Sequence, residues 1–143
     1  MVFIYWVLTS QEIFMVSDLN SNQLEATKRN PYMALMGKLE ELANYGHICL
    51  LQFPKIEKFL LCAEIRTTMA TIIRGVVTSW KKYHKKTTLT ETDIEVEMLR
   101  VLVRRALDLK YINIHRYEVW IKHIDVVGKM LGGWIKANAT NVA

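Results

Sequence analysis

The helical spacing of apolar residues after residue 31 constrains this 143-residue chain more than any other feature. Apolar side chains return every three or four positions, which places them on one stripe of a helix packed against a core. The spacing is interrupted at Pro54, in the polar run 81–88 and near Lys110. These interruptions predict four helices, over residues 32–53, 54–83, 90–110 and 113–137.

Each predicted helix has a stripe that we expect to be buried, and the third has a second apolar face. The expected stripes are Tyr32, Leu35, Leu39, Leu42, Gly46, Cys49 and Phe53; Ile56, Leu60, Ala63, Met69, Ile73, Val76 and Trp80; Ile94, Met98, Val101 and Leu102, with Leu99, Val103 and Ala106 as the second face; and Tyr117, Ile121, Ile124, Gly128, Leu131 and Ile135. Local signals place the helix ends. Pro54 suits the first position of a helix, the acids after Thr90 suit a helix N-terminus, and Asn113 can cap the fourth helix.

The predicted fold is all-α, an up-down-up-down antiparallel four-helix bundle, because short links force neighbouring helices to run in opposite directions. A chain of this length with 51% hydrophobic and 23% charged residues suits one domain. We expect an N-terminal extension and linker over residues 1–31, the bundle over 32–137 and a tail over 138–143.

The sequence gives no signal for export or for a membrane span. Residues 1–16 are apolar but lack a positively charged start, and polar residues from Ser10 to Glu12 interrupt them. Cys49 and Cys62 stand in apolar surroundings without metal-site spacing, so we expect both to be buried thiols. The protein is therefore expected to be cytoplasmic and to have no membrane partner.

No catalytic, cofactor or metal motif is present in the sequence. It contains no glycine-rich phosphate loop, no GxSxG, no HExxH and no CxxC. The histidines are too far apart along the chain to share a metal, and no carboxylate cluster joins them. We expect no catalytic residue, no metal and no cofactor, and we expect that the protein is not an enzyme.

Positive charge is concentrated after residue 53. Of 19 Lys and Arg and 14 Asp and Glu, residues 54–143 hold sixteen and nine, and the net charge is +5. Rows of cations bind phosphate backbones, and an aromatic ring among lysines can stack on an unpaired base. The alternative is an ordinary solvated helix surface. The residues predicted to bind nucleic acid are Arg66, Arg74, Lys81, Lys82, Lys85, Lys86, Arg100, Arg104 and Arg105.

The fourth helix also carries Trp120, Val127 and Trp134 at heptad spacing beside its main stripe. A helix that is apolar on more than one side buries more surface than a lone four-helix monomer can cover. We therefore predict these three residues as an oligomer interface. A wide stripe facing the core of the monomer is the alternative.

Three segments resemble the accessory variability determinant of diversity-generating retroelements, within the wider family of four-helix proteins encoded in intervening sequences of ribosomal RNA genes. The segments are FPKIEKFLLCAEIR (53–66), YHKKTTL (83–89) and GKMLGGWIK (128–136). The resemblance covers residues 32–137. It implies a ring-shaped homopentamer that binds RNA and DNA and associates with the retroelement reverse transcriptase during mutagenic copying of template RNA.

Two functions of different classes are left open. The first is the nucleic-acid-binding accessory of a reverse transcriptase, in which charge reversal at Arg100, Arg104 and Arg105 is expected to abolish binding. The second is a structural protein–protein adaptor of the ribosomal RNA intervening-sequence family, which would not bind nucleic acid directly. An enzyme is a third interpretation, for which the chain supplies no nucleophile, base or metal site.

Overall fold

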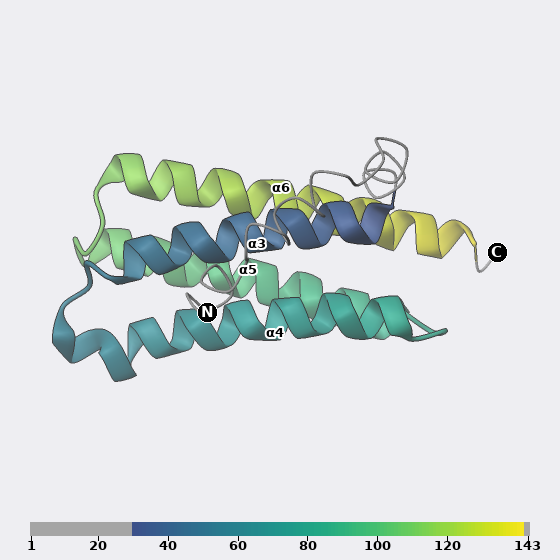
Figure 1. Cartoon of the computed structure of the whole chain (residues 1–143), viewed down its shortest axis with the longest axis horizontal. Coiled ribbons are helices and arrows are strands. Elements are labelled where there is room, and N and C mark those ends of the chain that lie inside the picture. The colour runs from purple at the N-terminus through teal and green to yellow at the C-terminus, as the bar shows by residue number, and fades with distance from the viewer. Residues whose placement is uncertain (1–29, 142–143) are drawn as a thin grey trace, which may run out of the picture. The chain divides into compact units, whose positions relative to one another are not determined.

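The computed structural model describes residues 30–141, and within them it contains helices and no strand. The elements are α3 (Pro31–Leu50), the short 3-10 helix η2 (Lys55–Phe59), α4 (Leu61–Lys81), α5 (Lys86–Asp108) and α6 (Ile114–Thr140), as Figure 1 shows. Residues 1–29 of the predicted extension and residues 142–143 of the predicted tail lie outside this range. The compact unit described below begins at Leu35.

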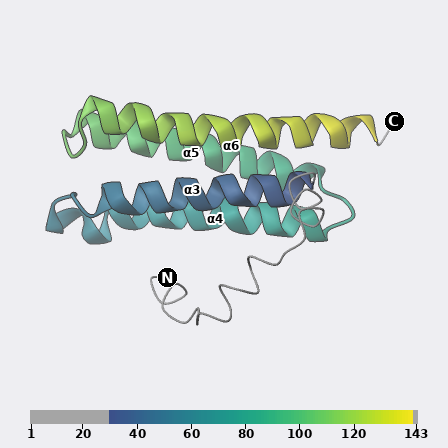
Figure 2. The ribbon, with the colours of Figure 1, turned by 45° about the horizontal axis from the view of Figure 1, so that its top comes forward.

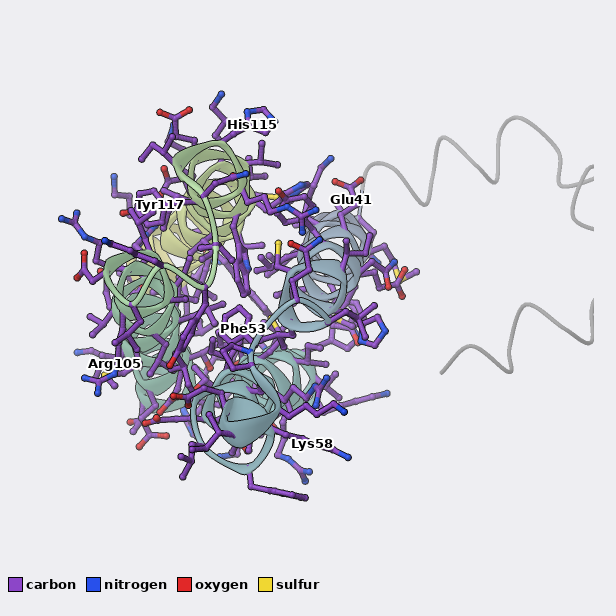
Figure 3. All side chains as sticks on the ribbon, turned by 90° about the vertical axis from the view of Figure 1, so that its left-hand side faces the viewer. Glu41, Phe53, Lys58, Arg105, His115 and Tyr117 are labelled. Atoms are coloured by element: carbon purple, nitrogen blue, oxygen red, sulfur yellow. The ribbon has the colours of Figure 1, made fainter. Side chains whose placement is uncertain are left out.

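The four α-helices form a bundle in which consecutive helices run antiparallel. Figure 2 shows α3 beside α4 and α5 beside α6, and the view along the helices in Figure 3 places one helix at each corner with side chains between them. The α3 helix also contacts α6, since the ring of Tyr45 lies 5.2 Å from that of His123. The all-α four-helix bundle predicted from the sequence is confirmed, whereas a ring-shaped assembly stays a prediction.

The core is built from one buried stripe on each helix. The buried residues are Leu35, Leu39, Leu42, Gly46, Cys49 and Leu50 in α3; Leu61, Cys62, Ile65, Thr68, Ile72, Val76 and Ser79 in α4; Leu89, Thr92, Val96, Leu99, Leu102, Val103 and Ala106 in α5; and Trp120, Ile124, Val127 and Leu131 in α6. The predicted stripe of the first helix is therefore confirmed over Leu35–Cys49. Trp120 is the largest fully buried side chain, and its ring lies against Gly46 of α3.

The second predicted helix is wrong at its start and in part of its stripe. After Pro54 the chain forms η2 and then kinks at Leu60, so α4 begins only at Leu61. The Glu57 carboxylate holds this arrangement, since it accepts hydrogen bonds from Leu61 N (3.1 Å) and Tyr111 Oη (2.8 Å). Of the predicted stripe, Val76 is buried, whereas Ile56 (75%), Leu60 (60%) and Trp80 (42%) are exposed.

The third predicted helix is wrong in its first residue and in its leading face. The α5 helix begins at Lys86, and the hydroxyl of Thr90 donates to Lys86 O inside the helix rather than preceding it. Its core side contains Leu99, Val103 and Ala106. Of the other predicted stripe, Leu102 is buried, whereas Ile94 (57%), Met98 (41%) and Val101 (59%) are exposed.

The fourth helix begins as predicted and ends later than predicted. Asn113 Oδ1 accepts a hydrogen bond from Arg116 N at 2.8 Å, which confirms the expected cap. The helix continues to Thr140, into the segment 138–143 that was predicted as a tail.

The predicted oligomer interface is wrong for two of its three residues. Trp120 is 1% exposed and Val127 is 0% exposed, because both face the core of the monomer, while Trp134 is partly buried. Side chains without accessible surface cannot contact a second subunit, so the alternative of a wide core-facing stripe holds for these two. By contrast, Ile94, Met98 and Val101 of α5 are apolar residues that the monomer leaves exposed.

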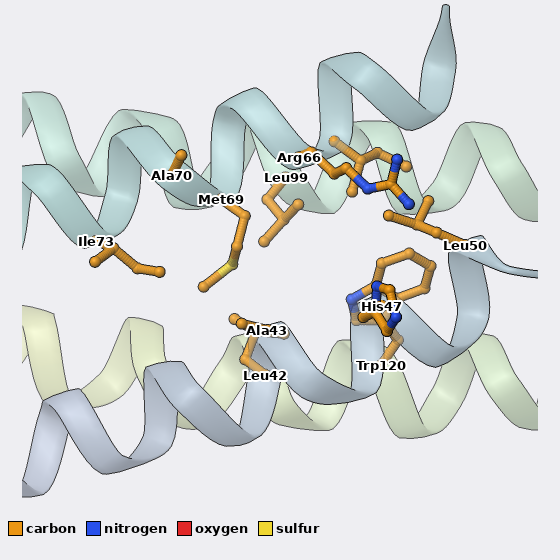
Figure 4. Close-up of a pocket in the computed structure, with 12 residues that line it drawn as sticks. Leu42, Ala43, His47, Leu50, Arg66, Met69, Ala70, Ile73, Leu99 and Trp120 are labelled. Carbon is orange, nitrogen blue, oxygen red and sulfur yellow. The ribbon is translucent and has the colours of Figure 1, made fainter. Parts of the chain in front are cut away.

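An apolar pocket of about 240 Å³ opens between α3 and α4 and reaches the core (Figure 4). Small residues line part of its wall, Ala43 and Gly46 on α3 and Ala70 on α4, and Met69 points into the space between the two helices. Two basic side chains, His47 and Arg66, complete the lining. No described helix is long and apolar enough to cross a membrane.

Candidate nucleic-acid interface

The lysine-rich end of the bundle is the surface that the structure builds most fully from the predicted basic residues. The loop after α4 and the first turn of α5 form this end, and Figure 1 shows it on the side of the bundle where α6 also ends. We call it the lysine tip and define it as residues 81–86 with Asn138 and Asn141 of α6. The lysine tip carries Lys81, Lys82, Lys85 and Lys86 together with Tyr83 and His84.

Lys85 fixes the shape of the lysine tip. Its ammonium donates to Ser79 O (2.8 Å), to Trp80 O (3.4 Å) and to Lys82 O. These carbonyls belong to the last turn of α4 and its C-cap, where helix carbonyls lack intrahelical partners. A lysine ammonium has three N–H donors, so these three hydrogen bonds use all the donors of Lys85. It is therefore a structural residue of the tip rather than one of its accessible cations.

Three further lysines of the tip are exposed to solvent, and the ammonium groups of two of them make no hydrogen bond within the described residues. Lys82 Nζ donates to Thr88 Oγ1 at 3.2 Å, which ties the loop to α5, while Lys81 Nζ and Lys86 Nζ have no hydrogen-bond partner in the described part of the chain. No carboxylate within the described residues lies in ion-pair range of any tip lysine. No carboxylate among residues 30–141 therefore neutralises the positive charge of the tip.

Tyr83 stands out from the loop with 90% of its surface exposed. Its ring centroid lies 4.9 Å from that of His84, and the two planes are nearly perpendicular at 85°. A tyrosine so exposed contributes almost nothing to the core. Tyr83, His84, Lys85 and Lys86 line a cleft of about 570 Å³ together with Asn138 and Asn141 from the end of α6.

The first turn of α5 adds to the positive potential of the tip. It contains no acidic residue, and the N-cap residue Lys85 makes no side-chain hydrogen bond to the first amides. Helix N-termini carry a partial positive charge that favours anions. The dipole of α5 therefore acts in the same direction as Lys81 and Lys86.

The arginines of α5 are brought together but are partly neutralised. Arg100 pairs with Asp125 of α6, with Nη2 and Oδ1 3.0 Å apart, and also with Glu97. Arg104 pairs with Asp108, with Nε and Oδ1 3.2 Å apart. Only Arg105 of the three lacks a carboxylate partner among the described residues.

The same arginines line a groove of about 570 Å³. Hydrogen bonds with Tyr117 and Asp108 raise the pKa of Arg104, so its guanidinium stays charged. Arg104 and Arg105 are both exposed, and Figure 3 shows Arg105 on the outside of the bundle.

The two arginines of α4 do not share a surface. Arg66 lines the apolar pocket beside α3, whereas Arg74 lines a groove beside α5 that also contains Glu91 and Glu95. Acids in the same groove lower the potential available to a phosphate near Arg74. The predicted row of cations along the second helix is thus divided between two sides of the bundle.

Sequence reasoning missed Asn138 and Asn141. Asn138 lies in the last turn of α6 and Asn141 is its C-cap residue, and the extension of that helix to Thr140 brings both to the cleft. Nothing in the sequence of this segment placed it beside residues more than fifty positions earlier.

The two cysteines are buried thiols, as expected. Cys49 has no accessible surface and Cys62 has 4%. Burial raises the pKa of both thiols, so they stay protonated and unreactive near neutral pH. Within residues 30–141 no group of His, Cys, Asp and Glu side chains could hold a metal ion.

The fold and the lysine tip define a small four-helix protein with a basic end. No curated protein matches the chain. A family model described as bAvd-like matches residues 33–138, most of the chain. The protein therefore belongs to the bAvd-like family, which confirms its resemblance to the accessory variability determinant.

Proposed function

We propose that this protein is a non-enzymatic accessory protein of a diversity-generating retroelement and binds RNA or DNA through the lysine tip. The observation that carries the proposal is a group of exposed lysines that have no acidic partner within residues 30–141 and surround an exposed tyrosine. Membership of the bAvd-like family supports the accessory role.

Phosphate binding by the tip gains free energy mainly from released counterions. Each phosphate neutralised on a single strand changes the logarithm of the binding constant by about 0.7 per tenfold change in salt. Lys81 and Lys86 of one subunit would contribute about 1.4 to that slope. Several subunits acting on one strand would multiply the effect.

Self-association is the second part of the proposal. Ile94, Met98 and Val101 lie four and three positions apart on α5, so they share one face, and all three are exposed. We propose that this face contacts a second copy of the chain in the homopentamer that the family resemblance implies. A reverse transcriptase is the proposed protein partner.

The adaptor function remains the second candidate because apolar side chains are also exposed at the end of the bundle opposite the lysine tip. Leu51, Ile56, Phe59 and Leu60 are each at least 60% exposed there. An adaptor would use such a surface to hold a protein partner and would not bind RNA or DNA at moderate salt.

Light scattering with and without a short RNA, at low and at high salt, separates these functions. A mass of about five subunits that takes up RNA at low salt and releases it at high salt supports the proposal. An oligomer that ignores RNA at both salt concentrations supports the adaptor. A monomer that ignores RNA contradicts both the assembly and the nucleic-acid function.

A further inference from the structure

We propose that the cleft of the lysine tip holds one unpaired nucleotide, so that the protein prefers single-stranded over duplex nucleic acid. The inference rests on the proposed nucleic-acid function and adds to it a specific site and a specific form of the ligand. Tyr83 is the residue that stacks on the base.

Tyr83 lies on a loop that side-chain hydrogen bonds tie to the helices on both sides of it. Lys85 bonds the end of α4 through three carbonyl contacts, and Lys82 bonds Thr88 of α5. Because these bonds are already made, little ordering of the loop is required when a ligand binds. The near-perpendicular His84 ring leaves at least one face of Tyr83 open, consistent with its 90% exposure.

The other residues of the cleft match the remaining parts of a nucleotide. Lys86 is an exposed cation with no acidic partner in the described chain, which suits a phosphate. Asn138 and Asn141 lie three positions apart near the end of α6, and both line the cleft. Each side-chain amide has donors and an acceptor, the combination that pairs with base edges. The cleft volume of about 570 Å³ lies in the range of small-ligand sites.

An unpaired base is favoured over a paired one for a geometric reason. In a duplex both faces of each base are covered by its neighbours in the stack, so a protein ring reaches them only after unstacking. In a single strand the faces are accessible, and stacking on an aromatic side chain tolerates any base. The lysines of the tip, in contrast, bind the phosphates of either form.

The test compares a fluorescein-labelled uridine strand of about 20 nucleotides with an RNA duplex of about 20 base pairs, using the full chain at one low salt concentration. Tyr83→Ala is expected to weaken binding of the single strand at least about fivefold and to change binding of the duplex by less than about twofold. Tyr83→Phe keeps the ring and should restore single-strand affinity.

Phe59→Ala is the matched control. Phe59 is an 80% exposed aromatic that also lies beside a lysine, with Lys58 Nζ 5.4 Å from its ring, but at the opposite end of the bundle. Its loss should leave both affinities unchanged.

An equal effect of Tyr83→Ala on both ligands, or no effect on either, overturns the stacking site while leaving the nucleic-acid function in place. Absence of binding to either ligand by the unaltered protein overturns the nucleic-acid function as well. Because Tyr83 is outside the core, the thermal unfolding of Tyr83→Ala should match that of the unaltered protein, which separates a binding defect from a folding defect.

Discussion

Gly75 of α4 lies against Thr92 of α5, and its replacement by alanine tests the packing of these two helices. A methyl group added at Gly75 would lie 2.1 Å from Thr92 Oγ1 and 3.1 Å from Thr92 Cβ and Cγ2. Thr92 is buried, and its hydroxyl donates to Thr88 O at 2.7 Å. The threonine cannot turn away without losing that bond or directing its own methyl group at the new one.

The expected net effect of Gly75→Ala is a loss of stability. Overpacking of this kind costs about 1–3 kcal/mol, and loss of the Thr92 hydrogen bond adds about 1 kcal/mol. The higher helix propensity of alanine offsets about 1 kcal/mol. We therefore expect the free energy of unfolding to fall by about 1–3 kcal/mol, measured by urea titration followed by circular dichroism.

Two other glycines provide controls for helix propensity. Gly37 in α3 and Gly132 in α6 have nothing within 4 Å of an added methyl group, so alanine there should stabilise by up to about 1 kcal/mol. The double variant Gly75→Ala/Thr92→Ala should recover part of the loss, because the clashing hydroxyl and methyl groups are gone. If Gly75→Ala stabilises as much as Gly37→Ala, the α4–α5 packing described above is incorrect.

Three further predictions concern the core and the ion pairs. Trp120→Ala should lower the free energy of unfolding by about 3–5 kcal/mol in a denaturant titration. A smaller decrease accompanied by dissociation of an oligomer would show that Trp120 lies at a subunit interface instead. Burial raises the pKa of Cys49 and Cys62, so both should react with a thiol reagent slowly in the folded protein and rapidly in urea, and fast reaction of the folded form would refute their burial. The same shift means that stability falls as the pH rises above about 8.5, where the unfolded thiols ionise and the folded ones do not. Asp125→Asn should lower the free energy of unfolding by less than about 1 kcal/mol, because solvent screens the partly exposed ion pair with Arg100. A larger decrease in a denaturant titration would show that the ion pair is more buried than described.

Local signals in the sequence predicted the parts of the fold that depend on local chemistry. The first helix follows its predicted stripe because residues 35–49 are helical without interruption, and Asn113 caps α6 through its own side chain. Pro54 misled the prediction, since a proline is compatible both with a first helical residue and with the start of a 3-10 turn. The 3-10 turn is favoured by Glu57, whose carboxylate accepts a hydrogen bond from Tyr111 in a distant part of the chain.

The candidate site could be predicted in part for the same reason. The lysine-rich segment 81–86 is contiguous in sequence, so its composition alone identified it. The neutralisation of Arg100 by Asp125 depends on the packing of α5 against α6, which no local pattern encodes. Likewise, the two apolar faces of the third helix looked equivalent in sequence, and only the packing showed that Ile94 faces outward.

The salt dependence of RNA binding tests the lysine tip most directly. The comparison uses Lys81→Gln/Lys86→Gln and the matched control Lys55→Gln/Lys58→Gln, whose exposed lysines lie at the opposite end of the bundle. The tip variant should lower the slope of log affinity against log salt by about 1.4 per bound subunit, and the control should leave the slope unchanged. Equal slopes for the unaltered protein and the tip variant would contradict the central claim that this end of the bundle binds the phosphate backbone.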